Sequence, residues 1–301
     1  MTSASSVEQQ RDTREILRKV RRVEISTRAI VRDLFSGEYH SVFKGRGMNF
    51  AEVREYVRGD DIRQIDWNVT ARMGHPFVKV FQEERELTVI LAVDLSASQQ
   101  FGATGQIKRE LITEVCAVLA FSAIRNNDRV GLLLFSDRVE KFIPPEKGNS
   151  HILTIIRHLL YWQPEGKGTA ISNSLQHLNR LLKKRGIVFL VSDFLDNDFE
   201  QAMRTLKKRH DLIALSVSDP LEAELPGEGW LRVEDLESGR RRWVHSGSRR
   251  FRKNFREQRD HWQSELERSF KRARVDYINL STDSSYIKPI IHFFKKRAGR
   301  R

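Results

Sequence analysis

One pattern dominates residues 87–294: a short apolar or β-branched run, a turn, and then an amphipathic helix, repeated several times. The first run, residues 87–93 (LTVILAV), is almost continuously apolar, as is typical of a strand buried on both faces. Strands that alternate with helices form parallel sheets covered by helices. The pattern predicts a doubly wound, Rossmann-like α/β domain around a central, mostly parallel six-stranded sheet.

The predicted elements follow one another closely along this domain, which we expect to span residues 87–297. Strands are expected at 87–93, 130–135, 139–143, 187–191, 212–217 and 275–280, and helices at 107–122, 150–161, 171–184, 199–208 and 284–296. Residues 218–248 interrupt the alternation with two short strand patterns around a Glu-Ser-Gly turn, which predicts an inserted β-hairpin.

The first 86 residues lack this alternation. Residues 1–44 are expected to form a basic amphipathic helix, whose heptad-like seam either docks on a partner or covers the chain's own core. The seam consists of Ile16, Val20, Val23, Thr27, Ile30 and Leu34. Residues 45–86 are rich in Gly, Arg and Asp and have no clean period. We expect them to form a small β-rich subdomain held by ion pairs.

Cysteine content and hydropathy narrow the classes of protein. The single cysteine, Cys116, excludes an intramolecular disulfide framework and sites that need several cysteine ligands, and it suits a reducing compartment. No stretch approaches the roughly 18 apolar residues that span a bilayer, and the N-terminal residues do not resemble a signal peptide. We therefore expect a cytoplasmic protein with no membrane span.

The net charge of +13 is concentrated near one end of the chain. Residues 237–301 hold 19 Lys and Arg but 7 Asp and Glu. Such a block is either a solvated helix face or a surface for nucleic acid, anionic lipid or an acidic protein. If nucleic acid binds, the phosphate contacts are expected from Arg249, Arg250, Arg252, Lys253, Arg256 and Arg259. These residues belong to a basic helix expected after the hairpin, which carries an aromatic and apolar stripe at Phe251, Phe255, Trp262, Leu266 and Phe270. At helical spacing such a stripe is more typical of core than of base stacking.

An oxygen-rich constellation is predicted at the carboxyl edge of the sheet. The first strand runs directly into Asp94-Leu95-Ser96-Ala97-Ser98, whose alternate residues face one side. Thr169 follows a glycine-rich loop, and Asp193 closes a later strand. Ligands of doubly wound sheets bind outside the carboxyl ends of the strands, at the switch point, so the three loops should converge there. Carboxylate and hydroxyl oxygens suit a hard cation, although a capped strand-to-helix turn also favours Asp and Ser.

Together these residues resemble the metal-ion-dependent adhesion site of a von Willebrand factor A domain. The wider chain, from about residue 45 to residue 294, resembles a bacterial family of A-domain proteins of unknown function, often encoded beside MoxR-type AAA+ ATPases. The family's signature block is matched by Arg54-Glu55-Tyr56, Gly59-Asp60-Asp61, Arg63, Ile65-Asp66-Trp67, Ala71-Arg72 and Glu83-Glu84.

This resemblance implies a site for Mg²⁺ or Mn²⁺ with an open position for a carboxylate from a protein partner. Ser96 and Ser98 would bind the metal directly, while Thr169, Asp94 and Asp193 would bind it directly or through water. The resemblance also implies an adaptor or co-chaperone that works with a MoxR-type AAA+ ATPase in assembling or activating protein complexes.

The sequence does not match four known signatures of nucleotide-binding or catalytic sites. Gly166-Lys167-Gly168-Thr169 lacks the first glycine of a Walker loop, and the glycines of residues 45–50 do not form a dinucleotide fingerprint. The chain has neither a Gly-x-Ser-x-Gly elbow nor a His-Glu-x-x-His pair. We expect a binding protein rather than an enzyme, with nucleic-acid binding as the alternative and a metal-dependent hydrolase as the least favoured reading.

Overall fold

The computed structural model describes residues 18–31, 49–82, 86–101, 107–224, 229–234 and 239–299. They belong to two compact units. The larger unit contains the helical segment over residues 18–31 and everything from Thr88 onward, and the smaller unit lies between Phe43 and Leu87. The boundary between the units thus falls within one residue of the one predicted at 86/87.

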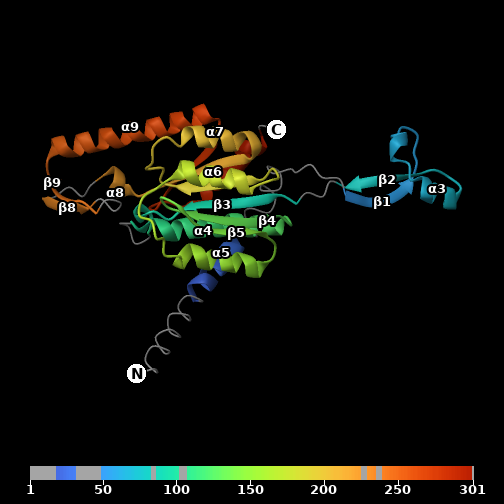
Figure 1. Cartoon of the computed structure of the whole chain (residues 1–301), viewed down its shortest axis with the longest axis horizontal. Helices are drawn as coiled ribbons and strands as arrows, with labels where there is room; N and C mark the ends of the chain where they lie inside the picture. Colours follow the sequence, from blue (N-terminus) through green and yellow to red (C-terminus); the bar gives the residue numbers. More distant parts are fainter. Residues whose placement is uncertain are drawn as a thin grey trace, which may run out of the picture. The chain divides into compact units, whose positions relative to one another are not determined.

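The larger unit is built on a six-stranded sheet with the order β10-β7-β6-β3-β4-β5 (Figure 1). Neighbouring strands are parallel except β5, which runs antiparallel to β4 at one edge. The strands are β3 (Thr88–Asp94), β4 (Arg129–Phe135), β5 (Val139–Glu146), β6 (Ile187–Ser192), β7 (Asp211–Ser218) and β10 (Asp276–Ser281). This confirms the predicted fold class, and each strand begins within one residue of its predicted start.

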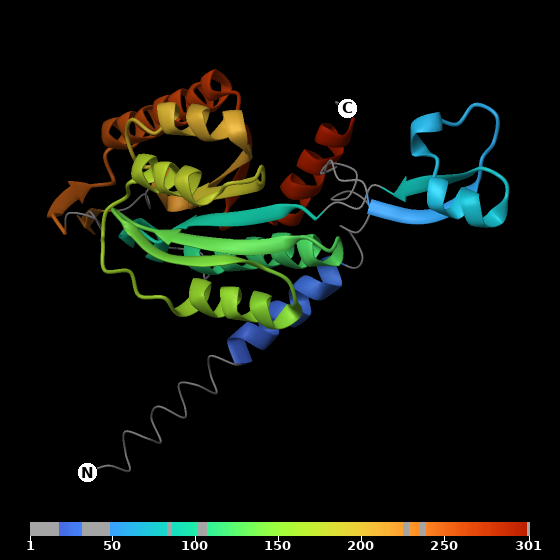
Figure 2. The same cartoon turned by 45° about the vertical axis from the view of Figure 1, so that its right-hand side comes forward.

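Helices cover both faces of the sheet, as Figures 1 and 2 show. On one side lie α4 (Lys108–Arg125) and α5 (Asn149–Tyr161), and on the other α6 (Ile171–Leu181), α7 (Glu200–Arg209) and α9 (Arg249–Ala273). A final helix, α10 (Ile287–Ala298), packs on β10. Helix α6 ends three residues before its predicted end, because Leu182 adopts an extended backbone conformation that leads the chain towards β6.

Burial of the central strands explains their composition. All residues of β6 are buried, and in β3 and β4 only the first residue is not. A strand covered by helices on both faces has no side exposed to water. Its residues are therefore apolar at successive positions instead of alternating between apolar and polar. The sheet thereby becomes a rigid base for the loops at its carboxyl edge.

The path of the chain creates a switch point beside β3. From β3 the chain moves outward on one side to β4 and β5, and then returns to the other side of β3 to form β6, β7 and β10. Loops that leave β3 and β6 therefore turn away from each other, and the crevice between them is where doubly wound folds bind ligands.

The predicted insertion is present as a short helix and a hairpin. Helix α8 (Pro220–Ala223) follows β7, and β8 (Trp230–Glu234) pairs antiparallel with β9 (Arg241–His245). The 25-residue helix α9 comes next, and its predicted aromatic stripe turns into the core at Phe270, which packs edge-on against Phe194 with ring centroids 4.9 Å apart. At that end of α9 the stripe is core, as its spacing indicates.

The helical segment over residues 18–31 lies beside α4 and α5 (Figure 2). Val20, Thr27 and Val31 are buried, and the guanidinium of Arg28 lies over the ring of Phe121, 5.4 Å from its centroid. This part of the seam covers the chain's own core, one of its two predicted roles. The seam's first and last members, Ile16 and Leu34, lie outside the described residues.

The smaller unit contains β1 (Asn49–Glu55), a 3₁₀ turn (Ile62–Gln64), α3 (Trp67–Met73) and β2 (Phe77–Gln82), with β1 and β2 antiparallel. It is less β-rich than predicted, because Asp66 caps α3 by accepting hydrogen bonds from the backbone of Asn68 and Val69. The expected ion pairs are present: Arg54 binds both carboxylate oxygens of Asp60 at 2.8 and 2.7 Å.

Among the residues that the structure describes, no helix is both long and apolar enough to cross a bilayer.

Candidate functional site

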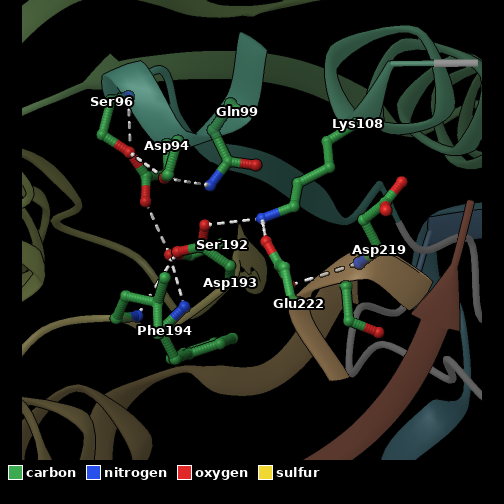
Figure 3. Close-up of polar contacts among 12 residues, drawn as sticks. Asp94, Ser96, Gln99, Lys108, Ser192, Asp193, Phe194, Asp219 and Glu222 are labelled. Carbon is green, nitrogen blue, oxygen red and sulfur yellow. Dashed lines mark hydrogen bonds and ion pairs between the residues drawn. The ribbon is translucent and has the colours of Figure 1, made fainter. Parts of the chain in front are cut away.

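The loop that leaves β3 gathers a carboxylate and two hydroxyls (Figure 3). Asp94, the last residue of β3, is fully buried, and its Oδ1 accepts a 2.8 Å hydrogen bond from the backbone N–H of Ser96. The hydroxyl oxygens of Ser96 and Ser98 lie 3.0 Å apart. The alternate spacing predicted from the sequence thus brings these side chains together at the end of the strand.

The loop after β6 brings a second carboxylate to the same place. Ser192 donates its hydroxyl to Asp94 Oδ2 at 2.6 Å and accepts the backbone N–H of Phe194 at 2.9 Å. Asp193, next in sequence, is 2% exposed. Its Oδ1 accepts the backbone N–H of Leu195 at 3.3 Å, and its Oδ2 accepts the ammonium of Lys108 at 3.0 Å. The carboxylates of β3 and β6 therefore meet at the switch point.

The glycine-rich loop before α6 borders this pair of loops. The Lys167 carbonyl accepts the backbone N–H of Ala97 at 3.0 Å, and the backbone N–H of Ala170 donates to the Ser136 carbonyl at 2.8 Å. Thr169 lies between these two anchored positions and is partly exposed. Backbone hydrogen bonds therefore join the Thr169 loop to the loops that follow β3 and β4.

Glu140 of β5 holds the glycine-rich loop in place by accepting hydrogen bonds from its backbone. Its Oε1 accepts the Ser136 hydroxyl at 2.6 Å and the Gly166 backbone N–H at 3.0 Å, and both oxygens accept the Glu165 backbone N–H. Burial alone would raise the pKa of Glu140, but the hydrogen bonds from Ser136, Gly166 and Glu165 outweigh it, so this pKa lies below its ordinary value. The loop is held by a carboxylate that stays charged.

We expect Gly166→Ala to displace this loop. A Cβ at Gly166 would lie 2.2 Å from Asp137 Oδ1 and 2.3 Å from the buried Ser136 hydroxyl. To make room, Ser136 would have to leave Glu140, which loosens the segment that carries Thr169. Mn²⁺ affinity measured by isothermal titration calorimetry should fall by about tenfold, the range seen when groups that orient ligands are removed. Gly148→Ala, where added carbon meets nothing within 4 Å but φ is +102°, is the control for backbone strain alone; an equal loss there would contradict this explanation.

Electrostatics inside the cluster favours a cation. Burial and the neighbouring Asp193 carboxylate raise the pKa of Asp94 to about 7, and its hydrogen bonds from Ser192 and Ser96 offset this only in part. Two buried carboxylates that repel each other, among hydroxyl groups, form the environment in which a bound cation relieves the most repulsion.

The donor set fits Mg²⁺ or Mn²⁺. Carboxylate and hydroxyl oxygens suit hard cations. No group of three or more His, Cys, Asp or Glu that could hold a metal ion occurs among the described residues, so a metal at this site would depend on the hydroxyl groups beside the two carboxylates. One further buried oxygen is unsatisfied: Gln99 is 1% exposed, its Oε1 has no hydrogen-bond partner, and its Nε2 lies 3.5 Å from the Ser98 hydroxyl. If a metal binds, Ser96, Ser98 and Thr169 would offer hydroxyls to it, and Asp94 and Asp193 would offer carboxylates.

The part of the chain that forms this site matches a known protein family. The model of the family described as "Protein of unknown function DUF58" matches residues 52–265, which include all three loops. The chain belongs to the DUF58 family. This agrees with the unknown-function family inferred from the signature block, part of which, at residues 83–84, lies outside the described residues.

Relatives of this DUF58 protein extend over nearly its whole length. It is 28% identical to the uncharacterized protein Rv1480 of Mycobacterium tuberculosis over 289 residues, 95% of this chain and 91% of the relative. Among solved structures it is similar to BatB from Bacteroides thetaiotaomicron, with TM-score 0.49 and 18% identity over 71% of this chain and 99% of BatB. It is also similar to mussel proximal thread matrix protein 1 with a zinc-occupied MIDAS motif, with TM-score 0.36 and 20% identity over 45% and 39% of the two chains.

In this DUF58 chain the predicted phosphate contacts lie on α9. Arg249, Arg250, Lys253 and Arg256 are exposed, and Arg252 is partly exposed. Two of these arginines pair with carboxylates. Arg256 lies 2.5 Å from Glu224, and Arg259, whose side chain is only 12% exposed, lies 3.6 Å from Glu222. Arg259 is thus part of a buried network rather than of a free basic surface.

Two residues of the site were not among those predicted from the sequence. Lys108, at the start of α4, is completely buried and contacts both Asp193 and Glu222 of α8 (Figure 3). A lysine that opens an amphipathic helix and a glutamate in an inserted segment carry no motif. The only usable signal was the capping pattern of Asp219 and Glu222 around α8.

Proposed function

We propose that this protein is a metal-dependent protein-binding module that recognises an acidic side chain of a partner. The observation that carries the proposal is the convergence of Asp94, Ser96, Ser98 and Asp193 at the switch point of the sheet, with the Thr169 loop hydrogen-bonded beside them. The metal proposed is Mg²⁺ or Mn²⁺.

The geometry supports an adaptor role for the metal. Mg²⁺ keeps several waters when few carboxylates hold it, and an exchangeable water can be replaced by a carboxylate from another protein. Here the Asp94 and Asp193 oxygens are already engaged by hydrogen bonds, and the Ser96 and Ser98 hydroxyls face each other. Mg²⁺ takes six ligands, so even a cation held by all five proposed side chains retains one coordination position for a partner.

Binding is favoured over catalysis by the surroundings of the site. Lys108, the cationic side chain that contacts Asp193, is paired with two carboxylates and is therefore a poor general base. The hydroxyls of Ser96 and Ser98 lie 3.0 Å apart, and the carboxylate that the Ser96 side chain also contacts, Asp94, already accepts the Ser96 backbone N–H and the Ser192 hydroxyl. Neither arrangement supplies the activated nucleophile that a hydrolase would need.

For the partner, we propose a MoxR-type AAA+ ATPase, with this protein as its adaptor or co-chaperone in assembling or activating other complexes. The support is the resemblance of the signature block and metal motif to A-domain proteins encoded beside such ATPases.

A binding assay between purified proteins tests this proposal. The immobilised protein is titrated by biolayer interferometry with the MoxR-type ATPase of the same organism, in Mg²⁺ and in EDTA without nucleotide. Wild type is compared with the double variant Ser96→Ala, Ser98→Ala. Because both members of this hydrogen-bonded pair are removed together, neither hydroxyl is left without its partner. We expect association for wild type in Mg²⁺ only, and a loss of about tenfold or more for the double variant.

Association that is equal in Mg²⁺, in EDTA and for the double variant would overturn the metal-dependent reading. No association under any condition would overturn the choice of partner. Calorimetry with Mn²⁺ alone, run beside the assay, tests the metal site without any partner.

A further inference from the structure

Lys108 occupies a position that is unfavourable for a cation. It is the first residue of the 18-residue helix α4, and its side chain is completely buried. Helix N-termini carry partial positive charge from unpaired backbone N–H groups, so a buried ammonium there opposes the helix dipole as well as losing its hydration. An interaction of matching strength must hold it in place.

That interaction comes from two acidic residues on different elements. Lys108 Nζ lies 3.0 Å from Asp193 Oδ2 and within hydrogen-bond contact of Glu222 Oε1 (Figure 3). The Lys108 ammonium therefore lies between two carboxylates, out of contact with water, and its positive charge balances them.

Glu222 is itself fixed from the other side. Its Oε2 accepts the backbone N–H of Asp219 at 3.2 Å, completing the capping box of α8, and lies 3.6 Å from the Arg259 guanidinium. Arg259 in turn lies over the ring of Trp262, 4.4 Å from its centroid. A chain of alternating charges, buried at Asp193 and Lys108 and partly exposed at Glu222 and Arg259, thus runs from the β6 loop to α9.

We propose that Lys108 is a resident cation of the candidate metal site, which neutralises Asp193 and sets how tightly a divalent cation binds. This inference rests on the proposed metal site and adds the residue that tunes it. With Lys108 in place, the two buried carboxylates stay together without a metal, and an arriving cation meets a site whose charge is already partly balanced.

The proposal predicts, for each of two substitutions, whether divalent-cation binding becomes stronger or weaker. Lys108→Met removes the positive charge and keeps an unbranched chain of similar length, so a divalent cation then meets the full charge of Asp94 and Asp193. Glu222→Gln removes a negative charge on the far side of Lys108, so it makes the surroundings more positive. Damage to packing alone would weaken cation binding in both variants, whereas the charge mechanism moves them in opposite directions.

The test is Mn²⁺ binding to the full chain by isothermal titration calorimetry, with melting temperatures recorded with and without Mn²⁺. Lys108→Met should bind Mn²⁺ about tenfold or more tightly than wild type, because a unit charge acts strongly on a divalent ion at short range in a dry site. Its melting temperature should be lower than that of wild type without metal and should rise more on adding Mn²⁺. Glu222→Gln should bind several-fold more weakly.

Lys207→Met is the matched control. Lys207 also pairs with an aspartate, lying 2.9 Å from Asp211 Oδ1, but at the amino end of β7, the opposite edge of the sheet from the site. It should leave Mn²⁺ affinity unchanged.

The outcomes separate this inference from the proposed function. If wild type binds Mn²⁺ and Lys108→Met binds it equally or more weakly, the role of Lys108 is wrong while the metal site stands. If wild type does not bind but Lys108→Met does, Lys108 takes the place of the metal, which supports its role as resident cation and overturns the metal-dependent function. If neither binds, both are wrong.

Discussion

Replacing Asp94 by asparagine is expected to weaken Mn²⁺ binding by on the order of 100-fold, at the upper end of the losses seen when metal-site groups are altered. The fold should survive, because Asn keeps an acceptor for the Ser96 backbone N–H and turns an amide towards the Ser192 hydroxyl. Without metal, the melting temperature should be equal to or higher than that of wild type. The reason is that burial and Asp193 disfavour the charged form of Asp94, and the neutral amide removes that penalty.

Asp211→Asn is the matched control for this prediction. Asp211 is another largely buried carboxylate of the same sheet, but it begins β7 at the edge opposite the site. Its loss should leave Mn²⁺ affinity unchanged and lower stability. If Asp94→Asn retained wild-type affinity by calorimetry, or lowered the metal-free melting temperature as Asp211→Asn does, then Asp94 would be a structural residue only.

The fold could be predicted from the sequence because its central strands are buried on both faces. A run such as residues 187–191 is apolar at every position, and helices with apolar stripes follow most of the strands. The smaller unit was predicted less well, because its helix α3 depends on the Asp66 cap rather than on any apolar period.

The predicted site residues differ in how directly the structure joins them. Asp94, Ser96 and Ser98 share one loop, so their spacing alone brings them together, and Asp193 joins them because parallel strands end at one edge. Lys108 and Glu222 could not be predicted, because they lie 114 positions apart in the sequence. Only the tertiary structure shows that their charges meet beside Asp193. A local pattern can identify the oxygens of a site but not the distant charges that balance them.

The ion pairs around Asp211 predict how the domain responds to acid. Asp211 Oδ1 lies 2.9 Å from Lys207 Nζ, and both of its oxygens accept hydrogen bonds from Arg297 of α10. Burial alone would raise the pKa of Asp211, but Arg297 and Lys207 outweigh it and hold this pKa below its ordinary value of 3.8. The folded state therefore binds the proton less readily than the unfolded chain does.

The sign of the pH effect follows from that difference. A carboxylate whose pKa is lower in the folded state stabilises the fold fully above its unfolded pKa, and this contribution is lost as the pH falls through the folded pKa. At pH 7, Asp211→Asn should lower the free energy of unfolding by about 3 kcal/mol, because it leaves two partly buried cations without their shared anion. The gap between variant and wild type should stay constant from pH 7 to about pH 5 and close progressively below 3.8, as measured by urea unfolding at each pH. A gap that persists unchanged at pH 2.5, or that widens as the pH falls, would mean that the Asp211 side chain stabilises the domain by packing and not by its charge.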